Sequence, residues 1–210
     1  EQDDLSDMPA FSRAIRSRED DVARQHSETA LKDIAEGKPF GTLMNPKYGE
    51  IRYDLGSIGV RKPNGKTKGG KGFLHIVSER VAKDGATLDE AIDTAIRVGI
   101  AAERGTETKA LMNTRWLDHN GVRAIIALTE NGKPIITGYE IRADETSAAF
   151  LSSDALRSRP VIREAEIVAA LKDRIAKIRR DGNGRLGAAI AELGENPGKE
   201  RLARLEARYS

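Results

Sequence analysis

The chain has 210 residues, of which 32% are charged, 39% are apolar and 4% are aromatic. It contains no cysteine, which excludes disulfide bonds, thiolate metal ligands and a cysteine nucleophile. No run of about 18 apolar residues occurs, so neither a membrane-spanning helix nor a membrane partner is expected. The length fits one domain with a hydrophobic core and helical extensions.

The chain begins with Glu1, and no signal peptide follows. We therefore expect it to be a piece of a longer polypeptide. The absence of cysteine fits a reducing compartment, and we expect a cytoplasmic location.

The net charge of +2 is unevenly distributed. Residues 1–37 hold ten acidic and five basic side chains, whereas residues 61–83 hold seven basic side chains and one acidic one, Glu79. A local basic cluster is typical of a surface that binds a polyanion. A solvated, flexible loop is the alternative explanation, and the charges alone do not decide between the two.

Residues 8–36 predict one or two helices, which Gly37 and Pro39 end. The segment 48–60 alternates apolar and polar residues. It predicts a strand or a short hairpin that turns near Gly56.

Residues 61–72 are basic and rich in glycine, which predicts a loop. A helix is predicted over residues 72–83 and another over residues 87–103. In the second helix, Thr87 and Glu90 have the spacing of a capping box, and apolar residues recur on one face.

Three β segments are predicted next, at residues 109–117, 122–130 and 134–141. The dipeptide Asn131–Gly132 between the last two is the strongest local signal for a hairpin. The pattern therefore predicts an antiparallel meander packed against the helix at 87–103.

A charged helix is predicted over residues 160–180, a break at 181–184, and short helices within 185–209. The expected fold class is α+β, with an antiparallel sheet of about four strands packed on helices. We expect helical extensions at both ends of the chain. The predicted domains are an N-terminal extension, a central domain and a C-terminal helical region, with boundaries at 1–47, 48–143 and 144–210.

Histidine is the best indicator of chemistry, because the chain has only three, His26, His75 and His119. An imidazole titrates near neutral pH and suits general acid–base catalysis. His75 opens a predicted helix just after the basic, glycine-rich loop, where amides and cations favour a phosphate. A lone histidine is nevertheless more often structural.

Several other sites are not supported by the residue spacing. The chain has no Walker A sequence and no G-x-S-x-G sequence, which argues against a P-loop and a serine hydrolase. The three histidines lack the spacing of metal ligands, so we expect neither a metal site nor a cofactor.

The last predicted strand carries Thr137 and Tyr139 on one face, where they present hydroxyl groups. Arg115 and Arg123 on the preceding strands offer cations. Ordinary β propensity explains the same two hydroxyl residues without any site.

Two motifs carry a resemblance to a known family. The sequence "KGGKGFLHIVSER" opens a helix, and "IITGYEIR" closes the sheet. Together they resemble the phage and polymorphic-toxin nuclease domains of the barnase–EndoU–colicin–RelE-like superfamily. The resemblance covers about residues 48–143 and leaves the two helical flanks unexplained.

The resemblance implies an α+β, metal-independent ribonuclease that acts as a toxin or phage-delivered effector, including delivery into a target bacterial cell. It implies that His75 is the acid or base, that Lys71 steadies the phosphate, and that Thr137 and Tyr139 complete the pocket, with help from Arg115. The expected substrate contacts are Lys62, Lys66, Lys68 and Trp116, although core packing is the simpler role for the single tryptophan.

The implied chemistry uses the RNA's own 2′-hydroxyl as nucleophile and needs no cofactor. The expected partner is RNA, including unpaired tRNA loops, because paired A-form grooves are hard to read. An immunity protein, an antitoxin or a parent polyprotein is a further expected partner.

Two alternatives remain open on the sequence. The first is a non-catalytic interaction module of a phage or mobile-element polyprotein, which the charged terminal helices favour. The second is an ADP-ribosyltransferase, for which the required strand motif and catalytic glutamate do not occur in the right order.

Overall fold

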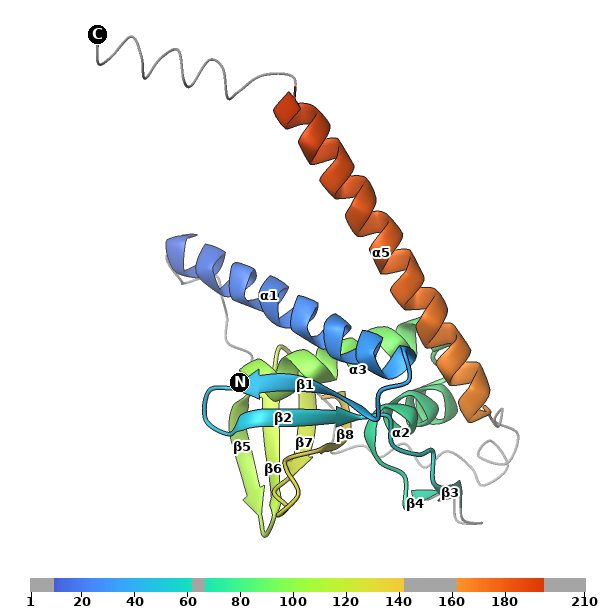
Figure 1. Ribbon diagram of the computed structural model, residues 1–210. Coiled ribbons are helices and arrows are strands. Elements are labelled where there is room, and N and C mark those ends of the chain that lie inside the picture. The colour runs from blue at the N-terminus through green and yellow to red at the C-terminus, as the bar shows by residue number, and fades with distance from the viewer. Residues whose placement is uncertain (1–9, 62–66, 142–161, 195–210) are drawn as a thin grey trace, which may run out of the picture. The chain divides into compact units, whose positions relative to one another are not determined.

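The computed structural model describes residues 10–61, 67–141 and 162–194 (Figure 1). The chain divides into two compact units, residues 1–172 and 173–210. The first unit combines helices with antiparallel strands, which confirms the predicted α+β class.

The principal sheet has four antiparallel strands in the order β5-β6-β7-β8. The strands are β5 (Thr106–Leu111), β6 (Thr114–His119), β7 (Val122–Ala127) and β8 (Ile135–Glu140). Each pairs with its neighbour in sequence, so the sheet is an antiparallel meander with one strand more than the three segments predicted over 109–141.

The predicted single strand at 109–117 is wrong, because a turn at Met112 and Asn113 divides it between β5 and β6. Met112 has a φ of 45°, in the left-handed region that tight turns require. The sequence has no glycine or proline at this turn, which is why a single strand was predicted. The next predicted strand also ends early, at Ala127 instead of residue 130.

Helix α3 (Leu88–Arg104) covers one face of this sheet, as expected for the helix predicted at 87–103. The strand residues on that face, among them Leu117 and Ile126, are almost fully buried. At Gly138 an added Cβ would lie 2.4 Å from Val98 of α3. Glycine at this position therefore lets the helix and sheet approach closely.

The predicted capping box is present at the start of α3. Thr87 Oγ1 accepts a hydrogen bond from the Glu90 amide at 3.3 Å, and the Glu90 carboxylate accepts one from the Thr87 amide at 2.8 Å. Two otherwise unpaired amides of the first turn are satisfied in this way.

Replacing Thr87 with alanine is expected to lower the free energy of unfolding by about 0.5–2 kcal/mol, because the cap is lost. The change is measured by urea denaturation with circular dichroism. Thr87→Ser keeps the hydroxyl and is expected to retain most of the stability. Equal losses in both variants would show that the hydroxyl does not act as a cap.

A second hairpin consists of β1 (Phe40–Asn45) and β2 (Gly49–Asp54). Of the two alternatives predicted for residues 48–60, the strand is confirmed by β2, whereas the hairpin with a turn near Gly56 is wrong because the partner strand is β1. Strand β1 was not predicted. Asn45 accounts for this turn, because its side chain accepts hydrogen bonds from the amides of Lys47 and Tyr48.

The N-terminal helix α1 (Ala10–Ala35) is continuous and packs against α3 and β1. The prediction of one or two helices over residues 8–36 is therefore confirmed, and the described part of the segment is a single helix. Among the described residues, no helix is sufficiently long and apolar to span a membrane.

The segment predicted as a loop at 61–72 is partly ordered. Strands β3 (Val60–Arg61) and β4 (Thr67–Lys68) pair at its base, and residues 62–66 lie outside the described residues. Helix α2 (Gly72–Glu79) follows and continues into a π-helical turn, η2 (Arg80–Asp84), which together correspond to the helix predicted at 72–83.

The break predicted at residues 181–184 is wrong, because helix α5 (Glu164–Gly194) runs through it. A glycine inside a helix costs about 1 kcal/mol, which good helix formers on both sides can offset. The part of the 185–209 prediction beyond residue 194 lies outside the described residues.

Candidate functional site

The position of His75 follows from the amphipathic pattern of α2. Phe73, Leu74, Ile76 and Val77 are buried, with exposed fractions of 2% or less. The Phe73 ring meets the Tyr53 ring edge-on, with 6.5 Å between the ring centroids. These contacts anchor the apolar side of α2 in the core. His75 lies outside this apolar side and is half-buried.

The basic, glycine-rich segment lies against the His75 ring. An added Cβ at Gly70 would lie 2.3 Å from His75 Nδ1, so a larger residue at position 70 would displace the ring. This segment is held to the preceding loop by two backbone hydrogen bonds between Ser57 and Lys71, of 2.9 and 3.0 Å. The fold therefore brings together the glycines and the histidine, as the sequence analysis expected.

Burial lowers the pKa of His75 below its ordinary value. The nearby Glu79 carboxylate and the Ile58 carbonyl act against this shift, whereas Lys83 and Arg80 add to it. Nδ1 is buried on the side of the ring that faces Gly70 and the Ile58 carbonyl, which is the backbone hydrogen-bonding group that acts on this imidazole. The lowered pKa favours the neutral imidazole at pH 7, which is the form that accepts a proton.

Glu79 is a residue of this site that the sequence analysis did not select. It lies one helical turn after His75 and is only 8% exposed. It accepts a 2.5 Å hydrogen bond from Thr67 Oγ1 on β4 and forms an ion pair with Lys83 of η2. The spacing His-x-x-x-Glu on one helix face was the available signal.

Burial of the Glu79 carboxylate by itself raises its pKa, but the hydrogen bonds from Lys83 and Thr67 outweigh this effect. The net pKa of Glu79 lies below its ordinary value. The side chain is consequently a fixed negative charge at neutral pH. We refer to Thr67, His75, Glu79 and Lys83 as the His75 cluster.

The predicted phosphate-binding lysines are only partly described. Lys68 and Lys71 are exposed, and Lys71 occupies the N-cap position of α2 with an extended backbone. The predicted contacts Lys62 and Lys66 lie outside the described residues.

Thr137 and Tyr139 lie on the sheet face opposite α3. In the strand register, Thr137 pairs with Ile125, and Tyr139 pairs with Arg123. Tyr139 accepts a 3.1 Å hydrogen bond from Arg123. Helix α2 packs against β8, so the helix of His75 adjoins the strand that carries both hydroxyls.

Trp116 shares this outer face through its pairing with Ile125. The Lys109 ammonium and the Arg123 guanidinium both lie over its ring, 4.5 and 4.6 Å from the centroid. Arg123 is itself fixed by two hydrogen bonds of 2.7 Å to Asp118. The indole is thus part of a cation–π cluster and is partly buried.

The structure places Arg115 apart from these residues. Arg115 alternates with Trp116 along β6 and so points to the other face of the sheet. It donates hydrogen bonds to the carbonyls of Met112 and Thr114 and lies 3.9 Å from Glu107. Among the described residues, no hydrogen bond or ion pair joins His75 to Thr137, Tyr139 or Arg115.

The other two histidines have carboxylate partners. His26 Nδ1 lies 2.9 Å from Glu103, and His119 Nε2 lies 2.9 Å from Asp20. Both contacts fasten α1 to the rest of the first unit. These contacts favour a structural role for His26 and His119, whereas His75 lies against the glycine-rich segment.

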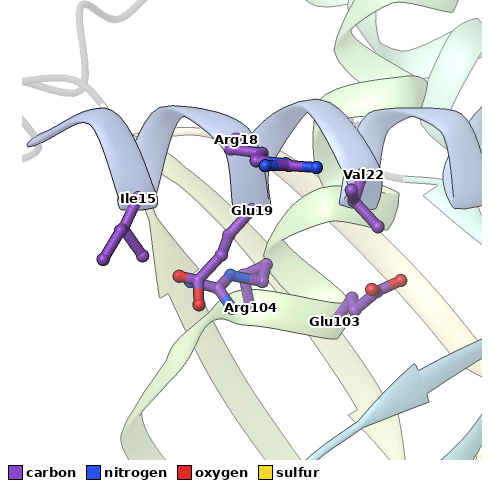
Figure 2. A pocket seen from close by; sticks show the side chains of 6 residues that line it. All are labelled: Ile15, Arg18, Glu19, Val22, Glu103 and Arg104. Atoms are coloured by element: carbon purple, nitrogen blue, oxygen red, sulfur yellow. The ribbon is translucent and has the colours of Figure 1, made fainter. Parts of the chain in front are cut away.

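A cavity of about 290 Å³ lies between α1 and α3 (Figure 2). Ile15, Glu19 and Val22 point from α1 toward α3, and Glu19 forms an ion pair with Arg104. Ile15 and Val22 are 43% and 42% exposed. The cavity's described lining, completed by Arg18 and Glu103, includes none of the predicted site residues.

Searches of protein-family models, curated proteins and solved structures found no match to this chain. Within the described residues, no three His, Asp or Glu side chains gather in the manner of metal ligands. The candidate function therefore rests on the geometry of the His75 cluster.

Proposed function

We propose that this protein is a metal-independent endoribonuclease that cleaves RNA through attack by the adjacent 2′-hydroxyl, with His75 as its acid–base residue. The observation that carries the proposal is the half-buried imidazole of His75, with a lowered pKa, against Gly70 of the basic, glycine-rich segment. The resemblance of the "KGGKGFLHIVSER" and "IITGYEIR" motifs to toxin and phage nuclease domains supports the same activity.

In the proposed reaction, neutral His75 removes the proton from the 2′-hydroxyl, whose oxygen attacks the adjacent phosphorus. The bond from phosphorus to the 5′-oxygen then breaks, and the protonated imidazole returns a proton to this leaving oxygen. The products are a 2′,3′-cyclic phosphate and a 5′-hydroxyl. The Lys71 ammonium stabilises the negative charge that develops on the phosphoryl oxygens.

Thr137 and Tyr139 supply hydroxyls from the strand that adjoins α2, and Trp116 offers a surface for an unpaired base. Arg115 lies on the opposite sheet face and has no part in this proposal. The partner is unpaired RNA, including tRNA loops, in the cytoplasm of the producing cell or of a target bacterium. An immunity protein that covers the His75 cluster belongs to the same proposal.

The test is incubation of the purified protein with RNA in the presence of EDTA, followed by analysis of the product ends. Fragments with 2′,3′-cyclic phosphates are expected. RNA with 2′-O-methyl groups and DNA of the same sequence are expected to remain intact, because the nucleophile is blocked or missing. Cleavage of DNA at the rate of RNA would contradict the proposed mechanism.

Reversing the charge of Lys66, Lys68 and Lys71 to glutamate is expected to weaken RNA binding and flatten its dependence on salt. Each phosphate contact to single-stranded nucleic acid contributes about 0.7 to the slope of log K against log salt. Loss of three contacts therefore reduces the slope by about 2. Fluorescence anisotropy across a salt titration measures the change.

The control reverses Lys32, Lys172 and Lys177, which changes the net charge equally outside the basic segment at residues 61–71. This control is expected to leave the slope close to that of the wild-type protein. Equal slopes in the two triple variants would remove the basic segment from the RNA site.

The cavity between α1 and α3 favours the second candidate function, a non-catalytic interaction module. Ile15 and Val22 expose apolar surface beside this cavity, and an interaction module would bind a partner protein through a surface of this kind. The RNA incubation distinguishes the two candidates, because an interaction module leaves every RNA substrate intact.

A further inference from the structure

The hydrogen bond between Glu79 and Thr67 connects two parts of the proposed site. Thr67 belongs to β4, and the chain then continues through Gly69 and Gly70 to Lys71. Gly70 packs directly against the His75 ring. A bond that fixes β4 on α2 therefore also fixes the segment that lies against the imidazole.

Glu79 is well suited to this role because its own surroundings hold it in place. Its side chain is 10% exposed, and its carboxylate receives one hydrogen bond from each side, from Thr67 on β4 and from Lys83 on η2. A carboxylate that is almost completely buried and accepts two hydrogen bonds has little rotational freedom. Its charge consequently stays at a constant place, one helical turn from His75.

The charges around His75 have opposite effects on its proton. The charged groups that act on the ring are Glu79, Lys83 and Arg80, and Arg80 is paired with Asp84 at 2.8 Å. Glu79 favours the protonated imidazole, whereas Lys83 and Arg80 favour the neutral one. Glu79 is the negatively charged group of this set. Its ion pair with Lys83 reduces the effect of its charge on the His75 ring.

We propose that Glu79 is the positioning residue of His75, holding the glycine segment against the imidazole through Thr67 and stabilising its protonated form during the reaction. This inference rests on the proposed ribonuclease function. In the reaction, His75 gains a proton from the 2′-hydroxyl and releases it to the 5′-oxygen. A fixed negative charge nearby stabilises the imidazolium between these two steps.

The first test needs no RNA. The pKa of His75 is measured by NMR titration of the imidazole resonances in the wild-type protein and in Glu79→Gln, which removes the charge and keeps a hydrogen-bond acceptor for Thr67. The His75 pKa is expected to fall in Glu79→Gln and to rise in Lys83→Gln. Glu130→Gln, in the connection between β7 and β8, is the matched control and is expected to leave the pKa unchanged.

The second test is the pH profile of RNA cleavage. In Glu79→Gln the acidic limb of kcat/KM is expected to move to lower pH, because this limb follows the pKa of the base in the free enzyme. Glu79→Asp, which retains the charge, is expected to keep the limb close to its wild-type position. Glu79→Ala also loses the Thr67 bond, and a misplaced ring is expected to reduce kcat by up to about a hundredfold.

The outcomes separate this inference from the proposed function. A His75 pKa that is the same in Glu79→Gln and wild type overturns the inference, whether or not the protein cleaves RNA. If the wild-type protein leaves RNA intact while the His75 pKa shifts as expected, the ribonuclease proposal fails, and the catalytic role of Glu79 fails with it.

Discussion

Replacement of His75 with alanine is expected to slow RNA cleavage by about a hundred- to ten-thousand-fold, the usual contribution of general acid–base catalysis. The physical reason is the loss of the neutral imidazole that accepts the 2′-hydroxyl proton in the proposed reaction. Because burial lowers the pKa of His75, this base is already present in wild-type protein at pH 7. Initial rates on a short RNA, with excess substrate, measure the effect.

The matched controls are His26→Ala and His119→Ala, which remove the other two imidazoles of the chain. Each of these pairs with a carboxylate and fastens α1, so their loss is expected to affect stability more than turnover. Circular dichroism verifies that all three variants are folded. Full activity in His75→Ala would rule out the proposed mechanism and favour the interaction module.

Replacement of Phe73 with alanine is expected to lower the free energy of unfolding by about 3–5 kcal/mol. Phe73 is fully buried and packs edge-on against Tyr53, so its removal leaves a cavity beneath α2. The same helix carries His75, and a loosened helix is expected to reduce RNA cleavage as well. Urea denaturation at fixed temperature measures the loss of stability.

The control is Val60→Ala on β3, where the valine is 73% exposed. Its effect on the free energy of unfolding is expected to stay within about 0.5 kcal/mol, as for most surface substitutions. If Phe73→Ala lowers the free energy of unfolding no more than this control does, then Phe73 does not anchor α2 to the core.

The candidate site was only partly predictable. The local sequence placed His75 at the start of a helix after a glycine-rich segment, and the structure has that arrangement. It did not reveal Thr67 as the partner of Glu79, because their contact depends on how β4 folds back onto α2. Nor did it reveal that Arg115 and Thr137 lie on opposite sheet faces, since the intervening strand register is set by tertiary pairing. The assignment of catalytic roles to these residues stays a prediction.

The sequence by itself determined the elements whose signals are local. The capping box at Thr87, the apolar face of α3 and the hairpin signal at Asn131–Gly132 are periodic or short-range patterns, and together they were sufficient for the α+β class. Only the tertiary structure decided where strands begin and end, as at the Met112 turn, and whether the segment at 181–184 interrupts a helix. The physical reason is that local preferences are small, about 1 kcal/mol for a glycine inside a helix, so packing and neighbouring helix formers outweigh them.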